Sequence, residues 1–494
     1  MTILKVSVSH YLRRSVRGNA MEMWLIQIDK SSPTPLYEQL YREMKGRIIR
    51  GDLAVGMKLP SKRKLAEFLS ISQTTIELSY GQLVAEGFIT AVARSGYFVE
   101  QVEELAYVEE ERDELVQLES VKHNYSIDFN SGRIDTTAFP FNQWRKYAKE
   151  VLDETSRDLL LLGHPQGDIE LRQEIASYLY SSRGVICTAQ QVVIGSGTEQ
   201  LMPLLIHLLG KQAIFAIENP GYPMTHHIFA NNERKTVAVS VDEEGMKVSE
   251  LENQPATVAY VTPSHQFPTG AILSASRRVQ LLNWASNKEG RYIIEDDYDS
   301  EFRYVGRPIP SLQGMDQRER VIYISTFSKS LMPSLRIAYF VLPKHLLQAY
   351  RRTFPYYSST VPRLDQHVLA QFMQDGHFSK HLNRMRKLYR KKLEKLTRAL
   401  EDYKPTVLIS GEQAGMHIVL TIDSPSTDVK LVNQAKQADI RVYALSEYHH
   451  ASESDYDKPQ VLVGFGGFQE EAIEPAVEAL MAAWNIKKHK QKKL

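Results

Sequence analysis

The sequence contains one cysteine, Cys187, among 494 residues, so no intrachain disulfide can form. This suits a reducing cytosol and excludes a disulfide-stapled secreted fold, and we interpret Cys187 as a packing residue rather than a nucleophile. No apolar run reaches membrane-spanning length, because the longest, near Leu201 to Leu209, is interrupted by Pro203 and His207. The formal net charge is only +1, so overall charge indicates no partner. We expect a cytoplasmic protein.

The length is too great for one ordinary domain, and 43% hydrophobic with 24% charged residues is typical of a globular protein. The pattern divides the chain into an N-terminal extension (1–25), a first domain (26–100), an acidic linker (101–126), a second domain (127–486) and a basic tail (487–494). The extension is basic but lacks the apolar segment of a secretory signal. We interpret the tail as a disordered, solvated end.

The first domain opens with a helical pattern, because apolar residues recur at four-residue spacing from Leu36 to Ile48. Two further helices are predicted after Ser61 and Ser72, since serine is a favoured N-cap residue. The third helix is expected to bury Ile76, Tyr80, Leu83 and Val84. Two short strands follow, at 88–91 and 96–99.

Three helices followed by a hairpin predict a winged helix-turn-helix that binds double-stranded DNA. Its third helix would enter the major groove, and basic residues at the start of the second would meet phosphates. The candidate DNA-contacting residues are Lys62, Arg63, Lys64, Ser72, Gln73, Thr74, Thr75, Arg94 and Gly96. A helical module for protein contacts is the weaker alternative.

The second domain alternates apolar strands with longer helical patterns, which predicts an α/β fold with a mostly parallel sheet. Five strands, at 191–194, 213–217, 257–261, 291–294 and 321–325, are each followed by a small or polar turn. In open α/β sheets, ligands bind beyond the carboxyl ends of the strands. We therefore expect the five turns to form one site.

Each turn offers a different chemical group. The glycine turn 195–198 precedes a helix and suits an anion, Tyr222 could stack on a flat ring, and His265 could contact a ligand. Five acids at 295–301 follow the fourth strand, and Lys329 follows the fifth. Taken singly, each has a plainer explanation: a packing tyrosine, a structural histidine, a solvated acidic run and a surface lysine.

Together the groups suit pyridoxal phosphate. This cofactor needs a lysine for its Schiff base, an anion site for its phosphate, a carboxylate for its ring nitrogen and an aromatic face for its ring. A lysine desolvated at the end of a buried strand has a lowered pKa and is a better nucleophile. The turns supply all four groups.

The segment PSKRKLAEFLSISQTTIELSYGQLVAEGFI (60–89) resembles the GntR family of regulators. About 65 residues share this likeness. The sequence departs from the family at Gln73, where arginine is common. Either a phosphate or guanine contact is missing, or adenine is read instead, since glutamine pairs well with adenine.

The second domain is similar to the fold-type-I aminotransferase superfamily and in particular to the MocR branch, which includes the regulator of γ-aminobutyrate use. The motifs are GHPQGDIELRQEIASYL (163–179), VVIGSGTEQ (192–200), ENPGY (218–222), TPSHQFPTG (262–270), IIEDDYDSEFRY (293–304) and STFSKSLMPSLR (325–336). With the GntR-like segment they cover nearly the whole chain.

The resemblance implies roles for individual residues. Lys329 would form the Schiff base, Asp296 would pair with the ring nitrogen, Tyr298 would bind the ring hydroxyl, and Tyr222 would stack on the ring. The phosphate would be held by Gly197, Thr198, Ser328 and Arg336, with Thr326 as a weaker candidate. His265 is a further candidate contact to the cofactor. Arginine suits phosphate because its guanidinium donates two parallel hydrogen bonds.

Phe267 stands where aminotransferases usually carry asparagine, which lowers the expectation of catalysis. Met224 and Glu447 stand where the γ-aminobutyrate-responsive member is expected to have arginines for its effector's carboxylate. We therefore do not transfer γ-aminobutyrate as the ligand. Arg441 or Arg363 could supply a carboxylate contact, and Glu447 could face a cationic group.

The sequence thus predicts a dimeric transcription regulator that senses an amine or amino acid through pyridoxal phosphate and binds paired half-sites. An aminotransferase with a DNA-binding tether is the first alternative. An empty scaffold without cofactor is the second. No metal is expected.

Overall fold

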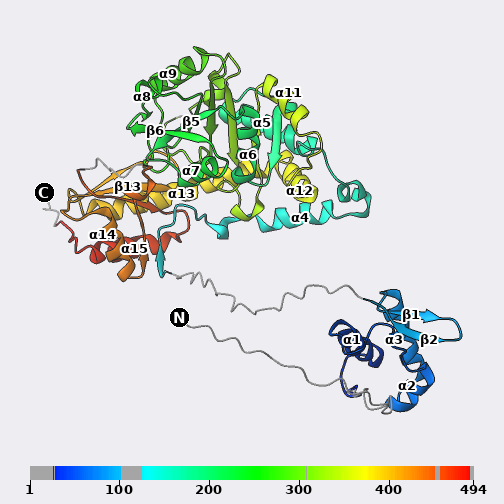
Figure 1. Cartoon of the computed structure of the whole chain (residues 1–494). Helices are drawn as coiled ribbons and strands as arrows, with labels where there is room; N and C mark the ends of the chain where they lie inside the picture. Colours follow the sequence, from blue (N-terminus) through cyan, green and yellow to red (C-terminus); the bar gives the residue numbers. More distant parts are fainter. Residues whose placement is uncertain (1–25, 27, 102–124, 307–308, 451–456, 490–494) are drawn as a thin grey trace, which may run out of the picture. The chain divides into compact units, whose positions relative to one another are not determined.

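The computed structural model describes residues 26, 28–101, 125–306, 309–450 and 457–489 (Figure 1). The chain divides into two compact units between Lys122 and His123, inside the segment predicted to be a linker. The predicted extension 1–25, residues 102–124 of the linker and residues 490–494 of the tail lie outside the described residues. Within the described part, no helix is long and apolar enough to cross a membrane.

The N-terminal unit has the predicted order of three helices and a hairpin. Its elements are α1 (Leu36–Ile49), α2 (Lys62–Leu69), α3 (Gln73–Ala85), β1 (Ile89–Val92) and β2 (Gly96–Val99). Both predicted caps are present: the Ser61 side chain accepts from the Lys64 N–H (3.3 Å) and the Ser72 side chain from the Thr75 N–H (3.1 Å). These bonds satisfy amide groups that a helix leaves unpaired at its start.

A small core holds this unit together. It contains Leu40, Met44, Ile48, Leu65, Ile76, Tyr80 and Leu83. Val84, which we expected to be buried, is 37% exposed. The inward face of α3 is centred on the row through residues 76, 80 and 83, so position 84 falls at its edge.

The C-terminal unit is built on an eight-stranded sheet in the order β4-β11-β10-β9-β8-β5-β6-β7. The strands are β4 (Val192–Gly195), β5 (Ile214–Asn219), β6 (Lys235–Asp242), β7 (Gly245–Met246), β8 (Val258–Val261), β9 (Tyr292–Asp296), β10 (Val321–Thr326) and β11 (Ala338–Val341). β5, β6, β8, β9 and β10 run parallel, and β11 lies antiparallel between β4 and β10. Because β11 is antiparallel to both of its neighbours, β4 runs in the same direction as β10. The carboxyl ends of the five predicted strands therefore lie at the same edge of the sheet.

Helices cover the sheet (Figure 1). They are α5 (Ile169–Arg183), α6 (Thr198–Leu209), α7 (Pro223–Asn231), α8 (Val248–Glu252), α9 (Ala275–Ser286), α10 (Leu312–Met315), α11 (Lys344–Thr353) and α12 (Arg363–Gln374). A further helix, α4 (Phe141–Val151), packs against α12. Three apolar clusters fill the space between helices and sheet: one on β4, β11 and α12, one on β5, β10 and α6, and one on β6, β8, β9 and α9.

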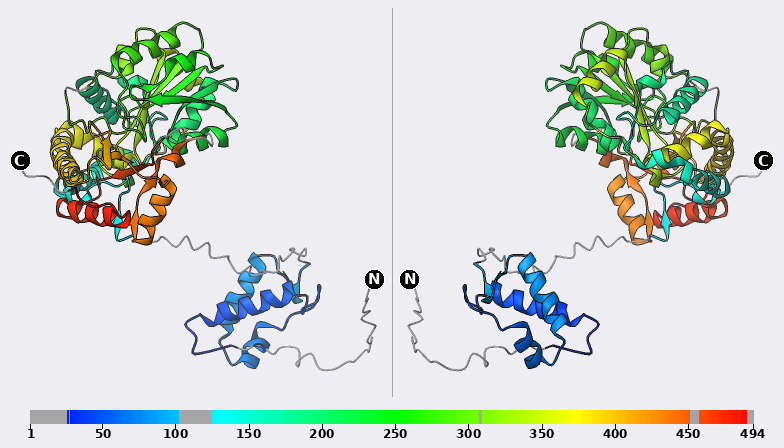
Figure 2. Two further views of the ribbon diagram at one scale, coloured as in Figure 1. Left: turned by 90° about the vertical axis from the view of Figure 1, so that its left-hand side faces the viewer. Right: turned by 90° about the vertical axis from the view of Figure 1, so that its right-hand side faces the viewer.

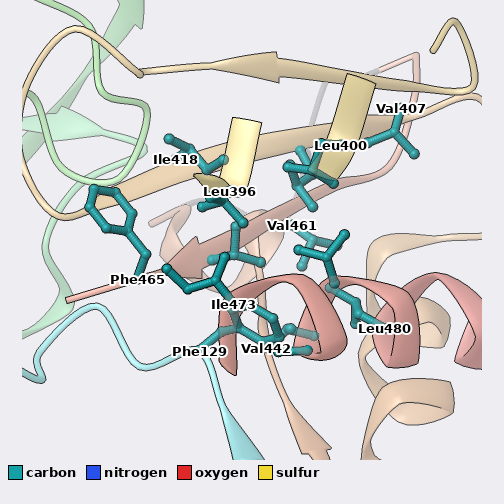
Figure 3. Close-up of a cluster of buried hydrophobic side chains, with 14 of the residues drawn as sticks. Phe129, Leu396, Leu400, Val407, Ile418, Val442, Val461, Phe465, Ile473 and Leu480 are labelled. Atoms are coloured by element: carbon teal, nitrogen blue, oxygen red, sulfur yellow. The ribbon is translucent and has the colours of Figure 1, made fainter. Parts of the chain in front are cut away.

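The end of the chain forms a second layer. It comprises α13 (His377–Glu401), β12 (Val407–Ser410), β13 (His417–Ile422), α14 (Asp428–Gln437), β14 (Ile440–Arg441), β15 (Tyr443–Ala444), β16 (Gln460–Gly464) and α15 (Ile473–Ala483). Four of these strands form a second sheet in the order β12-β13-β16-β15. Figure 3 shows Ile418 and Val461 of this sheet pointing toward Leu396 and Leu400 of α13 and toward Ile473 of α15. Both views in Figure 2 show α14 and α15 side by side. β3 (Ile127–Asp128) pairs with β14, which ties the start of this unit to its end.

The tail differs in part from the prediction that 487–494 is a solvated, disordered end. The backbone N–H of His489 donates to the carbonyl of Asp402 (2.7 Å), and Lys488 pairs with Glu478 (2.7 Å). The first residues of the tail are therefore held against α13 and α15.

Candidate functional site

The predicted DNA-reading surface lies on α2, α3 and the hairpin of the N-terminal unit. Ser72, Gln73 and Thr74 are exposed at the start of α3, and Thr75 is half-buried. Arg94 lies in the hairpin turn and Gly96 begins β2; their φ angles are positive, 61° and 117°, and Arg94 is exposed. The residues that would reach base edges and the wing arginine are thus accessible to a ligand.

Two of the three predicted phosphate-binding residues have acidic partners. Lys62 is paired with Glu77, and Arg63 is paired with Glu67 (3.0 Å), while Lys64 is exposed. Exposed ion pairs contribute little stability, so DNA phosphates can compete for both cations. Lys64 could bind a phosphate without first breaking an ion pair of this kind.

In the C-terminal unit, the strand ends surround a cavity of about 620 Å³. Nearly all of the predicted cofactor residues line it: Gly197, Thr198, Tyr222, Asp296, Tyr298, Thr326, Ser328, Lys329 and Arg336. His265 is not in the lining and lies behind it, fully buried. The prediction that five separate turns form one site agrees with this arrangement.

Lys329 follows β10 and is half-buried, with its ammonium inside the cavity wall. Its Nζ donates to the backbone carbonyl of Ser131. Burial lowers the pKa of Lys329 to about 8, and the nearby charge of Asp299 acts in the opposite direction. A lysine with such a pKa is partly neutral near pH 7 to 8 and can act as a nucleophile.

Asp296 ends β9 and is buried beside the same cavity. It accepts a hydrogen bond from the hydroxyl of Tyr260. Burial raises the pKa of Asp296 to about 7, and the charges of Asp297 and Asp299 add to the rise. Ionising such a buried carboxyl is costly unless a cation lies beside it. A protonated ring nitrogen is such a cation.

The acids after β9 are not a solvated surface run. Glu295, Asp296, Asp297 and Asp299 are all buried. Asp297 accepts from Arg183 Nε (2.7 Å) and from the Tyr323 hydroxyl (2.5 Å). Burial raises the pKa of Asp297, but the charge of Arg183 together with hydrogen bonds from Tyr323, Arg183 and Ser264 outweighs it and holds the pKa below its usual range.

The glycine turn at the start of α6 fits an anion. Gly197 has a φ of 129°, which strains any other residue, and a Cβ there would lie 2.2 Å from Arg336 Nη2 and so occupy the space beside this guanidinium. Arg336 donates to Glu199 (2.8 Å), and both side chains are about half exposed. Ser328 and Thr326 share a hydrogen bond (2.8 Å) beside them. A phosphate would find the α6 N-terminus, a guanidinium and two hydroxyls in one place.

Aromatic side chains form the wall of the ring site. Tyr222, at the N-terminus of α7, is 47% exposed and packs edge-on against Phe267, with ring centroids 5.4 Å apart. The hydroxyl of Tyr298 donates to the backbone carbonyl of His265 (3.0 Å). Phe267 stands among these rings without a hydrogen-bonding group, as the sequence indicated.

Only some of the candidate effector residues lie at the cavity. Met224 and Arg441 line the cavity, whereas Glu447 is exposed and absent from the lining; its neighbour Tyr448 lines the cavity instead. Arg363 is held by Asp168 (2.9 Å), away from the cavity. Of the two arginines that we considered for a carboxylate, only Arg441 faces this space.

Some residues that form the site could not be recognised as site residues from the sequence. The carbonyl of Ser131 is a backbone group, and Tyr260 was only one apolar residue of a predicted strand. His417 of β13 lines the cavity and packs against His265, with ring centroids 4.4 Å apart. The nitrogen and oxygen atoms of His265, Asp299 and His417 lie within 4.8 Å of one another.

Comparisons with known proteins agree with this geometry. The chain belongs to the aminotransferase class I and II family, whose model matches residues 125–478, and residues 36–99 match the model of bacterial regulatory proteins of the gntR family. The combination is that of a MocR-type transcription regulator, with a winged-helix DNA-binding domain joined to an aminotransferase-like domain.

Three relatives match almost the whole chain. YdeL of Bacillus subtilis (strain 168), an uncharacterised HTH-type transcriptional regulator, is 43% identical over 466 residues, 93% of this chain and 99% of that protein. MocR of Rhizobium meliloti, named as a probable rhizopine catabolism regulatory protein, is 30% identical over 486 residues, 93% and 96% of the two chains. PdxR of Corynebacterium glutamicum, a pyridoxine biosynthesis regulator, is 29% identical over 449 residues, 91% and 96%.

Solved aminotransferases share the fold of the C-terminal unit. Kynurenine aminotransferase of Pyrococcus horikoshii matches with a TM-score of 0.65 and 24% identity, over 74% of this chain and 92% of that one. The family implies pyridoxal phosphate as the cofactor. The residues fit it: a buried lysine, a buried carboxylate, and an anion cradle that a Cβ at Gly197 would fill.

Proposed function

We propose that this regulator senses an amine or amino acid in the cavity at Lys329 and changes its binding to DNA in response. The convergence of Lys329, Asp296 and Arg336 on one cavity, in a chain that also carries an accessible recognition helix, is the observation that supports this best. A ligand can shift DNA binding only if it binds one conformation more tightly than another. We further propose a cytoplasmic homodimer that binds paired half-sites.

Each residue has a defined task in this proposal. Pyridoxal phosphate, when bound, supplies an aldehyde carbon that amines attack. Lys329 would hold that carbon, Arg336 and the N–H groups at the start of α6 would bind the phosphate, and Asp296 would hold the proton on the ring nitrogen. Tyr222 and Phe267 would exclude water from the faces of the ring. Arg336 would exchange its ion pair with Glu199 for hydrogen bonds to the phosphate.

The effector is proposed to be an amino compound that carries a carboxylate and an apolar or aromatic body. Arg441 supports the first part, because it is the cation of the lining that is not already assigned to the cofactor. Its guanidinium lies 5.2 Å from the ring centroid of Tyr443, which restricts its orientation. Met224, Tyr443 and Tyr448 support the second part. Glu447 is not proposed as a contact, since it lies outside the lining.

The test is visible absorbance of the purified protein, with pyridoxal phosphate added, during titration with a panel of amines and amino acids. We expect an absorbance band of the bound cofactor. One class of compound should move this band to a new wavelength, at which it then remains. Lys329→Ala should remove the band, whereas Lys344→Ala, which alters an exposed lysine outside the cavity, should keep it. Absence of any band in the unaltered protein would contradict the proposal.

Effector specificity is tested separately with Arg441→Gln. The variant should keep the cofactor band and lose the response to carboxylate-bearing amines, while simple amines still react. An unchanged response to every compound would remove Arg441 from the proposal.

A second candidate function is aminotransferase activity, favoured by the pKa of Lys329 of about 8, which lets its Nζ accept and return a proton near neutral pH. Turnover of amino acid with an added keto acid would support it. A spectral change that persists unchanged when the keto acid is added would support the sensor.

A further inference from the structure

The long helix α13 of the C-terminal unit carries much more positive than negative charge. Its 25 residues include nine lysines and arginines but only two acids, Glu394 and Glu401. One side of the helix is buried in the unit and includes Phe378, Tyr389 and Leu393. Because this buried side fixes how the helix is turned, it also fixes which cations face outward.

Four of the cations form a row on the side opposite the buried one. They are Lys380, Arg384, Lys387 and Lys391, which we call the cationic row. Their spacings of four, three and four residues place them on a single face of an α-helix. All four are exposed. At a rise of about 1.5 Å per residue, the row is about 16 Å long.

No carboxylate neutralises the row within the part of the chain that the structure describes. None of its four side chains has an Asp or Glu oxygen of the described residues within 4.0 Å. Arg384 donates to the backbone carbonyl of Ala138, which is an uncharged acceptor. Lys392, on the buried side of the same helix, is instead paired with Asp135 (2.7 Å). Lys392 therefore has a structural partner, whereas the cationic row faces solvent with its charge uncompensated.

The C-terminal half of the same helix has acidic neighbours. Lys395 lines a groove of about 540 Å³ together with Glu470, Glu474 and Glu478, and Lys391 lies at this groove as well. The surface beyond Lys391 is thus mixed in charge. The uniformly positive part of the helix is the row that precedes it.

The N-terminal unit alone offers DNA few unpaired cations. Residues 26–101 contain ten lysines and arginines and eight acids. At the start of α2, Lys62 is paired with Glu77 and Arg63 with Glu67. Since each neutralised phosphate adds to affinity for DNA, contacts from a second cationic surface would strengthen binding by this chain.

We propose that the cationic row of α13 is a second DNA-binding surface, which contacts the phosphate backbone and does not read bases. Contacts of this kind add affinity and orientation but carry no sequence information. A duplex carries one phosphate for about every 1.7 Å of its axis, so a row about 16 Å long meets more phosphates than it has cations. Residues 102–124 join the two units, so DNA held by the N-terminal unit is offered to α13 at high effective concentration.

The test is the salt dependence of the affinity of the full chain for a long random-sequence DNA duplex, measured by fluorescence anisotropy. The double variant Lys380→Gln/Lys387→Gln removes two cations of the row, and glutamine keeps the helix propensity of lysine. Each lost phosphate contact should make the plot of log affinity against log salt concentration shallower by about 0.9, so the double variant should be shallower by about 1.8.

The matched control is Lys235→Gln/Lys288→Gln. Both lysines are exposed in the same unit, on β6 and after α9, and removing them changes the net charge by the same amount. The salt dependence of this control should equal that of the unaltered protein.

Amine-reactive labelling, read by mass spectrometry, gives an independent measurement on the unaltered chain. Added DNA should reduce the labelling of Lys380 and Lys387 and leave that of Lys235 and Lys288 unchanged. A row that only influences DNA binding from a distance would not be protected.

An unchanged salt dependence in Lys380→Gln/Lys387→Gln would overturn the inference. That is the result expected if the row is a solvated face, or if the acids at 103–119 of this chain cover it. An equal change in the control variant would also overturn it, because net charge and not the row would then be the cause. Failure of the unaltered chain to bind any DNA would overturn the role of the winged helix as well, which is a distinguishable result.

Discussion

Asp296 and Asp297 are neighbours in the chain, both are buried, and the same substitution should have opposite effects on them. In the cofactor-free protein, burial raises the pKa of Asp296 from 3.8 to about 7. Burial also raises the pKa of Asp297, but the guanidinium of Arg183 at 2.7 Å and the hydrogen bonds that this carboxylate accepts together hold its pKa below the usual range. Asp296→Asn should therefore stabilise the cofactor-free protein, and Asp297→Asn should destabilise it.

The size of the first effect follows from linkage. Between about pH 4 and pH 7 the unfolded chain ionises Asp296 while the folded chain does not, so the folded state loses stability as pH rises and levels off above pH 7. About three pKa units correspond to about 4 kcal/mol at pH 8, as an upper value. Asn can still accept the Tyr260 hydrogen bond and carries no charge. The gain should vanish near pH 4.

The size of the second effect comes from an unpaired buried charge. Removing one partner of a buried ion pair typically costs about 3–5 kcal/mol. Arg183 is 6% exposed and would keep Ser264 (2.6 Å) and the carbonyl of Ile309 (2.9 Å), but no carboxylate at Nε.

The assay is unfolding of the C-terminal unit, without cofactor, at pH 5 and pH 8 for the unaltered protein and both variants. Adding pyridoxal phosphate should reverse the ranking of Asp296→Asn, because the ring nitrogen then lacks its anion. A cofactor-free Asp296→Asn protein that is no more stable than the unaltered protein at pH 8 would refute the reasoning.

Three further predictions concern the two domains. Ser72→Ala should cost the N-terminal unit about 1 kcal/mol through loss of the α3 cap, measured by thermal unfolding with Ser95→Ala as the exposed control. Gln73→Ala should weaken binding to the preferred operator by about tenfold while non-specific DNA binding stays unchanged, measured by fluorescence anisotropy. Arg336→Gln should weaken affinity for pyridoxal phosphate by about tenfold or more, since a charge-assisted bond is lost; Arg352→Gln, on an exposed part of α11, should not, in an absorbance titration.

The parts of the fold that the sequence predicted well are those controlled by short-range pattern. The five strands whose ends form the cavity lie within one or two residues of their predicted positions, because each apolar run is followed by a turn. The caps Ser61 and Ser72 were predictable because a cap depends on residues three positions away. Their hydrogen bonds are present in the structure.

The parts that the sequence left open depend on partners far away in the chain. The ordinary explanation for the acids at 295–301 was a solvated surface, and a buried Asp297 is acceptable because Arg183, 114 residues earlier, and Tyr323 both donate to it. The antiparallel insertion of β11 between β4 and β10 was not predicted, since periodicity does not give strand order. The placement of Glu447 outside the cavity, next to a tyrosine inside it, depends on the turn that follows β15.

The central claim is that chemistry at Lys329 controls DNA binding. The most direct measurement is the affinity of the full chain, loaded with pyridoxal phosphate, for its operator DNA with and without the amine that shifts its spectrum, compared with Lys329→Ala. We expect this amine to change the operator affinity of the unaltered protein by about 5- to 150-fold, the usual range of coupling between sites, and to leave the operator affinity of Lys329→Ala unchanged. An equal response in Lys329→Ala, or a shifted spectrum with no change in operator affinity, would contradict it.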